Sequence, residues 1–223
     1  MTASVRYDSV FRPGLFEGRT IIVTGGGSGL GRCTAHELKS LGARVALVGR
    51  TLEKLERVKE ELGDPDTFIF SADLRREDEV KAAVAGVMSW GGGRIDGLVN
   101  NAGGSGPNDP LKMPTDKFED VFRFNVSSAY ELTRLCVPHM RAAGGGNIVN
   151  ISSGAARYAQ PYFSAYGTAK AALSHLTRLL AHDFAPEVRV NAIAPGPIMT
   201  AALDRALPAN MREGMIKNTP LKC

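Results

Sequence analysis

The chain has 223 residues, of which 43% are hydrophobic and 22% are charged, a composition typical of one soluble domain with a substantial core. Its 27 basic and 23 acidic residues are interspersed, so neither nucleic-acid binding nor membrane association is expected. No apolar run reaches the ~18 residues that a spanning helix needs, and the first residues lack the apolar segment of a secretory signal. Three scattered cysteines, Cys33, Cys136 and Cys223, argue against a disulfide framework or a zinc cluster and predict a cytoplasmic location.

Short apolar runs alternate with amphipathic segments along the chain. In chain order, the pattern predicts a strand over Thr20–Val23, a helix over Leu30–Leu41, a strand over Arg44–Val48, a helix over Leu52–Leu62, a strand over Phe68–Ser71, a helix over Glu77–Trp90, a strand over Ile95–Val99, a helix over Asp116–Ala142, a strand over Asn147–Ile151, a helix over Tyr162–Phe184 and a strand over Arg189–Ala194. We expect Gly42 and Gly63 to end the first two helices, and Pro138 to kink or shorten the fourth.

This alternation predicts an α/β fold in three layers, with a doubly wound, mostly parallel sheet between helices. We expect a single domain over residues 18–223, preceded by an N-terminal arm over residues 1–17. In such sheets ligands bind beyond the carboxyl ends of the strands. The segments that follow the predicted strands are GGGSGLG, GR, AD, NNAG, SSG and PGPIMT. They are rich in glycine and small polar residues, so the functional site is expected among them.

The turn from Thr24 to Gly31 contains five glycines. Glycine allows the backbone to approach a phosphate closely, and the helix that follows offers free N–H groups to an anion. No Lys-Ser/Thr pair follows the last glycine, which argues against an ATP-binding loop of the Walker type. The spacing fits TGxxxGxG rather than GxGxxG, and a plain strand-to-helix turn is the alternative interpretation.

The second predicted strand ends in Gly49-Arg50-Thr51, without the acidic residue that binds a ribose 2′-hydroxyl in many dinucleotide sites. The guanidinium of Arg50 is planar and always charged, which suits a 2′-phosphate. The sequence therefore favours NADP(H), with NAD(H) as the other possible cofactor. The alternative is that Arg50 is simply a solvated loop residue.

Tyr166 and Lys170 are four residues apart in a predicted helix and share one face of it, and Ser153 follows a predicted strand. An ammonium one helical turn away is expected to lower the pKa of the phenol, which then exchanges a proton with a carbonyl or alcohol oxygen. A hydroxyl such as that of Ser153 is suited to bind the same oxygen. The alternative is an ordinary amphipathic helix with a surface lysine.

A serine hydrolase is the rival from another class of enzyme. Ser153 lies in ISSG, which is not the GxSxG elbow of such enzymes. All four histidines lie in predicted helices, and they lack metal-ligand spacing with the cysteines; they are His36, His139, His175 and His182. No metal site is therefore expected.

Several motifs in this order together resemble the short-chain dehydrogenase/reductases, from about Leu15 to about Leu221. The residues that carry the resemblance are Thr24, Gly25, Gly29, Gly31, Asp73, Asn100, Asn101, Ala102, Gly103, Asn125, Ser153, Tyr166, Lys170, Pro195, Gly196 and Thr200. The resemblance implies a Rossmann fold and hydride transfer between a nicotinamide cofactor and a carbonyl or alcohol carbon. It also implies a homodimer or homotetramer, because the two long helices resemble the family's intersubunit bundle.

The resemblance also implies individual roles. Tyr166 would be the acid or base, Ser153 would polarise the substrate oxygen, and Lys170 would bind the nicotinamide ribose. Asn125 would hold a water in a proton relay to Lys170. The implied cofactor-binding residues are Thr24, Gly25, Gly27, Ser28, Gly29, Leu30, Gly31, Arg50, Asp73, Leu74, Asn101, Ala102, Gly103, Tyr166, Lys170, Pro195, Gly196, Ile198 and Thr200.

The substrate is expected to be a hydrophobic small molecule, because residues 104–113, 155–163 and 201–215, which would shape its pocket, contain many apolar side chains. The stretch from Tyr7 to Phe16 resembles the leader of bacterial enzymes near the citronellol dehydrogenases and the trans-2-enoyl-CoA reductases. The alternatives are therefore reduction of an enoyl-CoA double bond or of a 3-oxoacyl thioester. A non-catalytic dinucleotide-binding protein is the third hypothesis. Relatives usually continue past Leu221 with another helix and strand, so the chain is expected to lack these two elements.

Overall fold

The computed structural model describes residues 9–206 and 209–220, and its centre is a six-stranded parallel sheet with the order β3-β2-β1-β4-β5-β6. The strands are β1 (Thr20–Thr24), β2 (Arg44–Gly49), β3 (Phe68–Ser71), β4 (Gly97–Asn100), β5 (Gly146–Ile151) and β6 (Val188–Ile193). The order reverses between β1 and β4. A crevice that can hold a ligand is expected beyond the carboxyl ends of these two strands.

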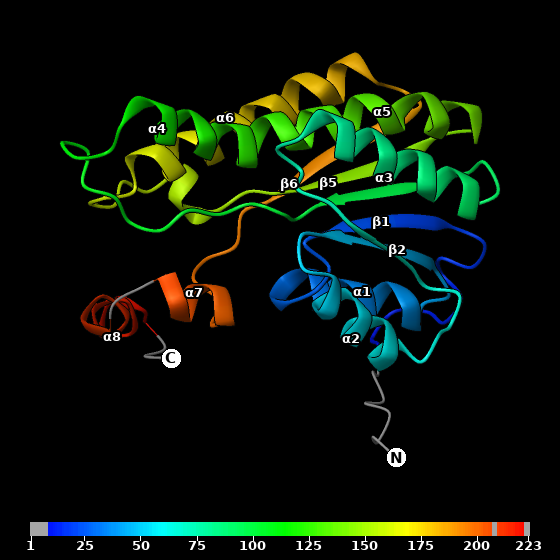
Figure 1. The fold of residues 1–223 in the computed structure, drawn as a ribbon, viewed down its shortest axis with the longest axis horizontal. Helices are drawn as coiled ribbons and strands as arrows, with labels where there is room; N and C mark the ends of the chain where they lie inside the picture. The colour runs from blue at the N-terminus through cyan, green and yellow to red at the C-terminus, as the bar shows by residue number, and fades with distance from the viewer. Residues whose placement is uncertain (1–8, 207–208, 221–223) are drawn as a thin grey trace.

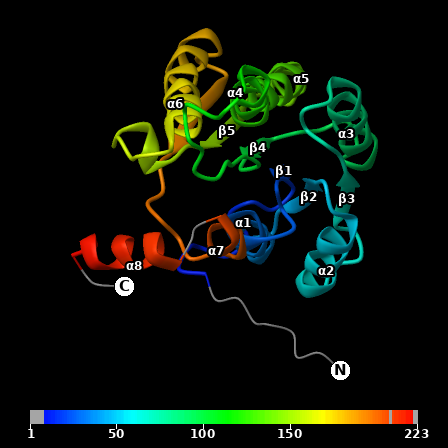
Figure 2. The same ribbon diagram turned by 60° about the vertical axis from the view of Figure 1, so that its left-hand side comes forward.

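Helices cover both faces of the sheet, as the sequence predicts (Figure 1). Those between the strands are α1 (Gly29–Ser40), α2 (Leu52–Leu62), α3 (Glu77–Trp90), α4 (Thr115–Phe122), α5 (Ser128–Ala142) and α6 (Ser164–Asp183). Figure 2 shows α1 and α2 on one side of the sheet and α3 to α6 on the other. The result is the predicted doubly wound, three-layer Rossmann arrangement.

The core explains why the strands read as continuous apolar runs. In β1, Ile22 packs into the core beneath α3, α5 and α6, whereas Ile21 and Val23 face the core beneath α1 and α2. Successive side chains of a strand point to opposite faces. Because both faces are covered by helices, every position of β1 is buried and polar alternation is absent.

The long helix predicted over residues 116–142 is interrupted. A π-helical segment, Arg123–Ser127, lies between α4 and α5, and it contains Asn125. Pro138 neither ends nor shortens the helix, since α5 continues to Ala142. The wider turn is not visible in residue periodicity, because a π-turn changes the spacing by only one residue.

The last predicted helix also begins later than expected, at Ser164 rather than Tyr162. Tyr162 has a φ of 68°, in the left-handed region, and therefore belongs to the loop before the helix. Two helices that were not predicted follow β6: α7 (Ala201–Ala206) and α8 (Ala209–Asn218). Residues 1–8 of the predicted arm and Leu221 to Cys223 lie outside the described residues.

Candidate active site

In the glycine turn between β1 and α1, main-chain atoms of different residues approach one another closely. Gly25 and Gly29 have φ angles of 64° and 54°, which favour glycine. A Cβ on Gly31 would lie 2.3 Å from the carbonyl oxygen of Gly25, so no side chain fits there. A Cβ on Gly27 would lie 2.9 Å from that of Lys54 in α2. Three of the predicted glycines are therefore required by backbone geometry itself.

The turn leads into a helix N-terminus suited to an anion. Ser28 caps α1, its side chain makes no capping hydrogen bond, and the first turn, which includes Leu30, has no acidic residue. Free N–H groups and the positive end of the helix dipole therefore face the turn without a competing carboxylate.

Hydrogen bonds join this turn to the end of β4. The hydroxyl of Thr24 accepts from the backbone N–H groups of Asn101 and Ala102, both at 3.0 Å. In return, the side-chain amide of Asn101 donates to the carbonyl of Thr24 at 2.8 Å. These hydrogen bonds fasten the glycine turn to the end of β4, where the strand order reverses.

A charged cluster lies beyond the ends of β2 and β3. The guanidinium of Arg75 donates to both carboxylate oxygens of Asp73, at 2.6 to 3.2 Å, and to Asp120 at 3.0 Å. The hydrogen bonds from Arg75 hold the pKa of Asp73 below its ordinary value. The exposed Arg50 and the half-buried Arg75 both approach the ring of Phe124, with the guanidinium carbon 5.3 and 5.8 Å from the ring centroid.

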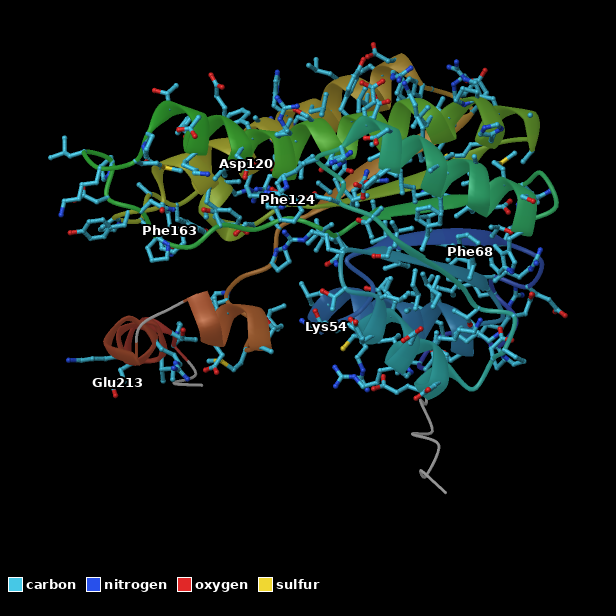
Figure 3. The ribbon with its side chains drawn as sticks, viewed as in Figure 1. Lys54, Phe68, Asp120, Phe124, Phe163 and Glu213 are labelled. Atoms are coloured by element: carbon cyan, nitrogen blue, oxygen red, sulfur yellow. The ribbon has the colours of Figure 1, made fainter. Side chains whose placement is uncertain are left out.

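The sequence predicts Arg50, Asp73 and the buried Leu74 for this region, but not Arg75, Asp120 or Phe124. Figure 3 labels Asp120, which lies on α4, and Phe124, which lies on the π-helical segment that follows α4. The two arginines come from different loops, and no sequence spacing relates them to Phe124. Only the tertiary structure brings them together.

The segment after β6 crosses back to the glycine turn. The carbonyl of Pro195 accepts from the N–H of Gly154 at 2.8 Å, which ties this segment to the end of β5. Farther along, a Cβ on Gly29 would lie 3.3 Å from the Cγ2 of Thr200, so Thr200 closes over the turn. Gly196 and Ile198, between them, are exposed.

Ser153, Tyr166 and Lys170 meet at the end of β5. The side chain of Ser153 lies beside the phenol of Tyr166, whose charged form it favours. The ammonium of Lys170 lies 5.8 Å from the centre of the Tyr166 ring and donates to the carbonyl of Ile151 at 2.8 Å. Lys170 is only 3% exposed, which excludes the alternative of a surface lysine.

The sequence predicts that Lys170 lowers the pKa of Tyr166, and for the chain by itself this prediction is wrong. Burial raises the pKa of Tyr166, and the neighbouring side chain of Ser153 opposes this shift without overcoming it. Burial also lowers the pKa of Lys170 to about 8. The ammonium points to a carbonyl rather than to the phenol oxygen, so desolvation, which disfavours the charged forms of both groups, prevails.

Asn125 lies against this group from the opposite side. Its side-chain oxygen accepts from the N–H of Gly104 at 2.9 Å, and its amide donates to the carbonyls of Gly104 and Val121. A Cβ on Gly103 would lie 2.7 Å from this oxygen and 3.0 Å from the Lys170 ammonium nitrogen. Glycine at 103 thus leaves room between Asn125 and Lys170.

Two of the three predicted substrate segments contact one another. The carbonyl of Tyr162 accepts from the N–H of Asn108 at 2.7 Å, and the ring of Phe163 meets that of Tyr166 edge-on at 6.2 Å. Figure 3 shows Phe163 on the loop before α6. Of the third segment, Leu207 and the side chain of Met211 lie outside the described residues.

The residues present fit a dinucleotide. The backbone at Gly25, Gly29 and Gly31 packs against neighbouring atoms without side chains between, at a helix N-terminus without acidic residues that suits a pyrophosphate. No group of three potential metal ligands occurs among residues 9–206 and 209–220. Within the same ranges, no helix is long and apolar enough to span a membrane. The cytoplasmic location and the oligomeric state stay predictions.

The depressed pKa of Lys170 predicts a specific pH dependence of stability. Above pH 8 the folded chain releases the Lys170 proton while the unfolded chain still binds it, so the free energy of unfolding rises with pH. Relative to that of Lys170→Met, the free energy of unfolding of the wild-type protein is expected to rise by about 2 kcal/mol between pH 8 and pH 9.5. Urea unfolding of both proteins across this range measures the difference. A difference that stays constant contradicts the prediction.

The chain matches known oxidoreductases over most of its length. The model of the short chain dehydrogenase family matches residues 19–210. An uncharacterized oxidoreductase of Mycobacterium tuberculosis is 44% identical over 92% of this chain and 79% of its own length. The 7alpha-hydroxysteroid dehydrogenase of Escherichia coli is 35% identical, with 92% and 81% covered.

Solved structures agree with these relatives. The citronellol catabolism dehydrogenase of Pseudomonas aeruginosa superposes with a TM-score of 0.78 at 42% identity, and 85% of this chain and 79% of that chain are covered. A 7 alpha-hydroxysteroid dehydrogenase in complex with NADH and 7-oxo glycochenodeoxycholic acid has a TM-score of 0.86 at 34% identity, with 94% and 83% covered. This chain therefore belongs to the short-chain dehydrogenase/reductase family, whose members are NAD(P)-dependent oxidoreductases of small molecules.

Proposed function

We propose that this protein transfers hydride between NADP(H) and a hydrophobic ketone, aldehyde or alcohol. The observation that carries the proposal is the meeting of Ser153, Tyr166 and the buried Lys170 at the end of β5. In the reducing direction, Tyr166 gives its phenolic proton to the substrate oxygen while Ser153 donates a hydrogen bond to it. The nicotinamide, when bound, supplies the hydride. Proton transfer from a positioned group contributes ~10²–10⁴-fold to rate.

The remaining residues hold the reactants. Gly25, Gly29 and Gly31 would bind the pyrophosphate, and Ile198 and Thr200 would contact the nicotinamide carboxamide. Asn101, Ala102 and Gly103 would line the ribose pocket, with Asp73 and Leu74 beside the adenine. Lys170 would hold the nicotinamide ribose, and Asn125 would hold a water that carries protons to it. The other residues assigned to the cofactor are Thr24, Gly27, Ser28, Leu30, Pro195 and Gly196.

The preference for NADP(H) follows from charge at the ends of β2 and β3. Arg50 is exposed and approaches Phe124, so its fork is available to a phosphate. Asp73 is the nearby carboxylate that would repel such a group, and Arg75 neutralises it through three hydrogen bonds. The two effects act in the same direction, since one attracts the 2′-phosphate and the other removes a repulsion.

A hydrophobic substrate is proposed because apolar side chains remain exposed around the site. Tyr158, Tyr162, Ile198 and Met199 are all more than one-third exposed, on the loops before α6 and after β6. The relatives whose names mention hydroxysteroids and citronellol suggest a steroid-like or terpenoid-like alcohol.

A substrate panel tests this function. Cyclic and acyclic hydrophobic ketones, a 3-oxoacyl thioester and crotonyl-CoA are each supplied with NADPH and with NADH, and cofactor oxidation is followed at 340 nm. We expect turnover of hydrophobic ketones with NADPH. Turnover of crotonyl-CoA alone indicates double-bond reduction, and cofactor binding without any turnover indicates a non-catalytic protein; either result contradicts the proposal.

The same assay on Arg50→Asp tests the cofactor preference. The substituted carboxylate repels a 2′-phosphate and accepts hydrogen bonds from a free ribose, so the ratio of kcat/KM for NADPH to that for NADH is expected to fall about 100-fold or more. Arg57→Asp, a change of equal charge on α2, is the control and should leave the ratio unchanged. A wild-type preference for NADH is incompatible with this assignment.

A further inference from the structure

Three consecutive residues at the end of β5 each contact the helix that carries Tyr166 and Lys170. The carbonyl of Ile151 accepts a hydrogen bond from the Lys170 ammonium, and the side chain of Ser153 lies beside the phenol of Tyr166. Between them, the hydroxyl of Ser152 donates to the main-chain carbonyl of Lys170 at 3.1 Å. Lys170 is thus held at both ends by adjacent residues, the last of β5 and the one that follows it.

Ser152 is itself firmly placed. It is 3% exposed, and its N–H donates to the carbonyl of Ile193 in β6 at 2.7 Å. Its hydroxyl also lies 2.6 Å from that of Ser174, which in turn donates to the carbonyl of Lys170 at 2.9 Å. The hydroxyls of Ser152 and Ser174 have two protons for these three contacts. In every arrangement at least one proton is donated to the Lys170 carbonyl, and Ser152 is linked to that carbonyl either directly or through Ser174.

We propose that Ser152 is a positioning residue, which holds the main chain of Lys170 against β5 so that the ammonium reaches both Ile151 and the face of Tyr166. The inference rests on the function proposed for Tyr166 and Lys170. Ser152 touches neither substrate nor cofactor in this account. It acts through the lysine, because a displaced main chain moves the ammonium at the far end of the side chain.

A purely structural bond between β5 and α6 is the competing interpretation, and the protein contains one for comparison. Asn150 of β5 donates to the hydroxyl of Thr177 in α6 at 2.9 Å, and both residues are buried. Thr177 lies seven residues beyond Lys170, with its hydroxyl bonded to the carbonyl of Leu173. Thr177→Val therefore removes a buried bond between the same two elements without touching Lys170.

The test compares Ser152→Ala, Ser152→Thr and Thr177→Val. In Ser152→Ala we expect kcat to fall about tenfold, the pH profile of kcat to shift by about half a unit or more, and NADPH affinity, measured by fluorescence, to weaken about fivefold. Ser152→Thr keeps the hydroxyl and should restore all three values. Thr177→Val should lower the melting temperature as much as Ser152→Ala while leaving kcat, the pH profile and NADPH affinity unchanged.

The outcomes separate this inference from the proposed function. Equal kinetic changes in Ser152→Ala and Thr177→Val, or no change in either, overturn the positioning role while Tyr166 and Lys170 keep theirs. Absence of rescue by threonine also counts against it. If the wild-type enzyme turns over no carbonyl, the proposed function fails, and NADPH affinity in the three variants still decides whether Ser152 positions Lys170.

Discussion

Replacement of Tyr166 by phenylalanine is expected to lower kcat by about 10³-fold or more and to leave NADPH affinity within about threefold. The change removes only the phenol oxygen, beside which the Ser153 side chain lies, and keeps the ring that packs edge-on against Phe163. Without that oxygen, no side chain is placed to exchange a proton with the substrate. Steady-state kinetics with a hydrophobic ketone and fluorescence titration of NADPH measure the two quantities.

Tyr130→Phe provides the matched control for this variant. Tyr130 is 46% exposed on α5, outside the residues assigned to the site, so loss of its hydroxyl should change kcat less than threefold. A Tyr166→Phe enzyme with near-normal turnover would remove the chemical basis of the proposed function. Loss of NADPH binding in that variant would indicate damage to the fold and not to proton transfer.

Gly31→Ala is expected to cause the second large effect, loss of NADPH binding together with loss of stability. The new Cβ would lie 2.3 Å from the carbonyl oxygen of Gly25 and 2.6 Å from the side-chain nitrogen Nδ2 of Asn101. The backbone of the glycine turn must move to relieve this overlap. Overpacking of this kind costs about 3 kcal/mol, which corresponds to a fall of roughly 6–12 °C in Tm for a chain of this size.

Displacement of the turn also moves the N–H groups that would bind the pyrophosphate, so NADPH affinity should fall by about 100-fold or more. Gly49→Ala serves as the control at the same site. Its Cβ would meet the Cδ2 of Leu55 at 3.5 Å and the Cα of Gly25 at 3.9 Å, both ordinary contacts, and its φ is not in the left-handed region. Melting curves and NADPH titrations of the two variants give the comparison. Normal affinity in Gly31→Ala would argue against pyrophosphate binding at this turn.

The strands and helices were predictable wherever one local pattern dominates. The apolar run from Arg44 to Val48 and the glycine at 63 correspond to β2 and to the left-handed end of α2. Prediction was wrong where a single residue changes the geometry. Tyr162 adopts a left-handed φ before α6, and the π-helical segment around Asn125 interrupts a helix whose side-chain periodicity looks continuous.

The electrostatics of the site was the part least accessible from the sequence. The four-residue spacing of Tyr166 and Lys170 predicts that they share a face, and they do. It does not reveal that Lys170 is 3% exposed, or that its ammonium donates to the carbonyl of Ile151. Burial reverses the expected shift in the pKa of Tyr166, since desolvation depends on all surrounding atoms and not on spacing along the chain.

The sequence alone determined the strand–helix alternation, the glycine turn and the chemical types of the groups beyond each strand, because these depend on residues a few positions apart. The tertiary structure decided which of those groups meet. Thr200 lies over Gly29 and Arg75 neutralises Asp73 beneath Phe124 because the parallel strands bring their carboxyl ends to one edge of the sheet. Contacts between residues that are distant in sequence follow from strand order and packing, which local periodicity does not encode.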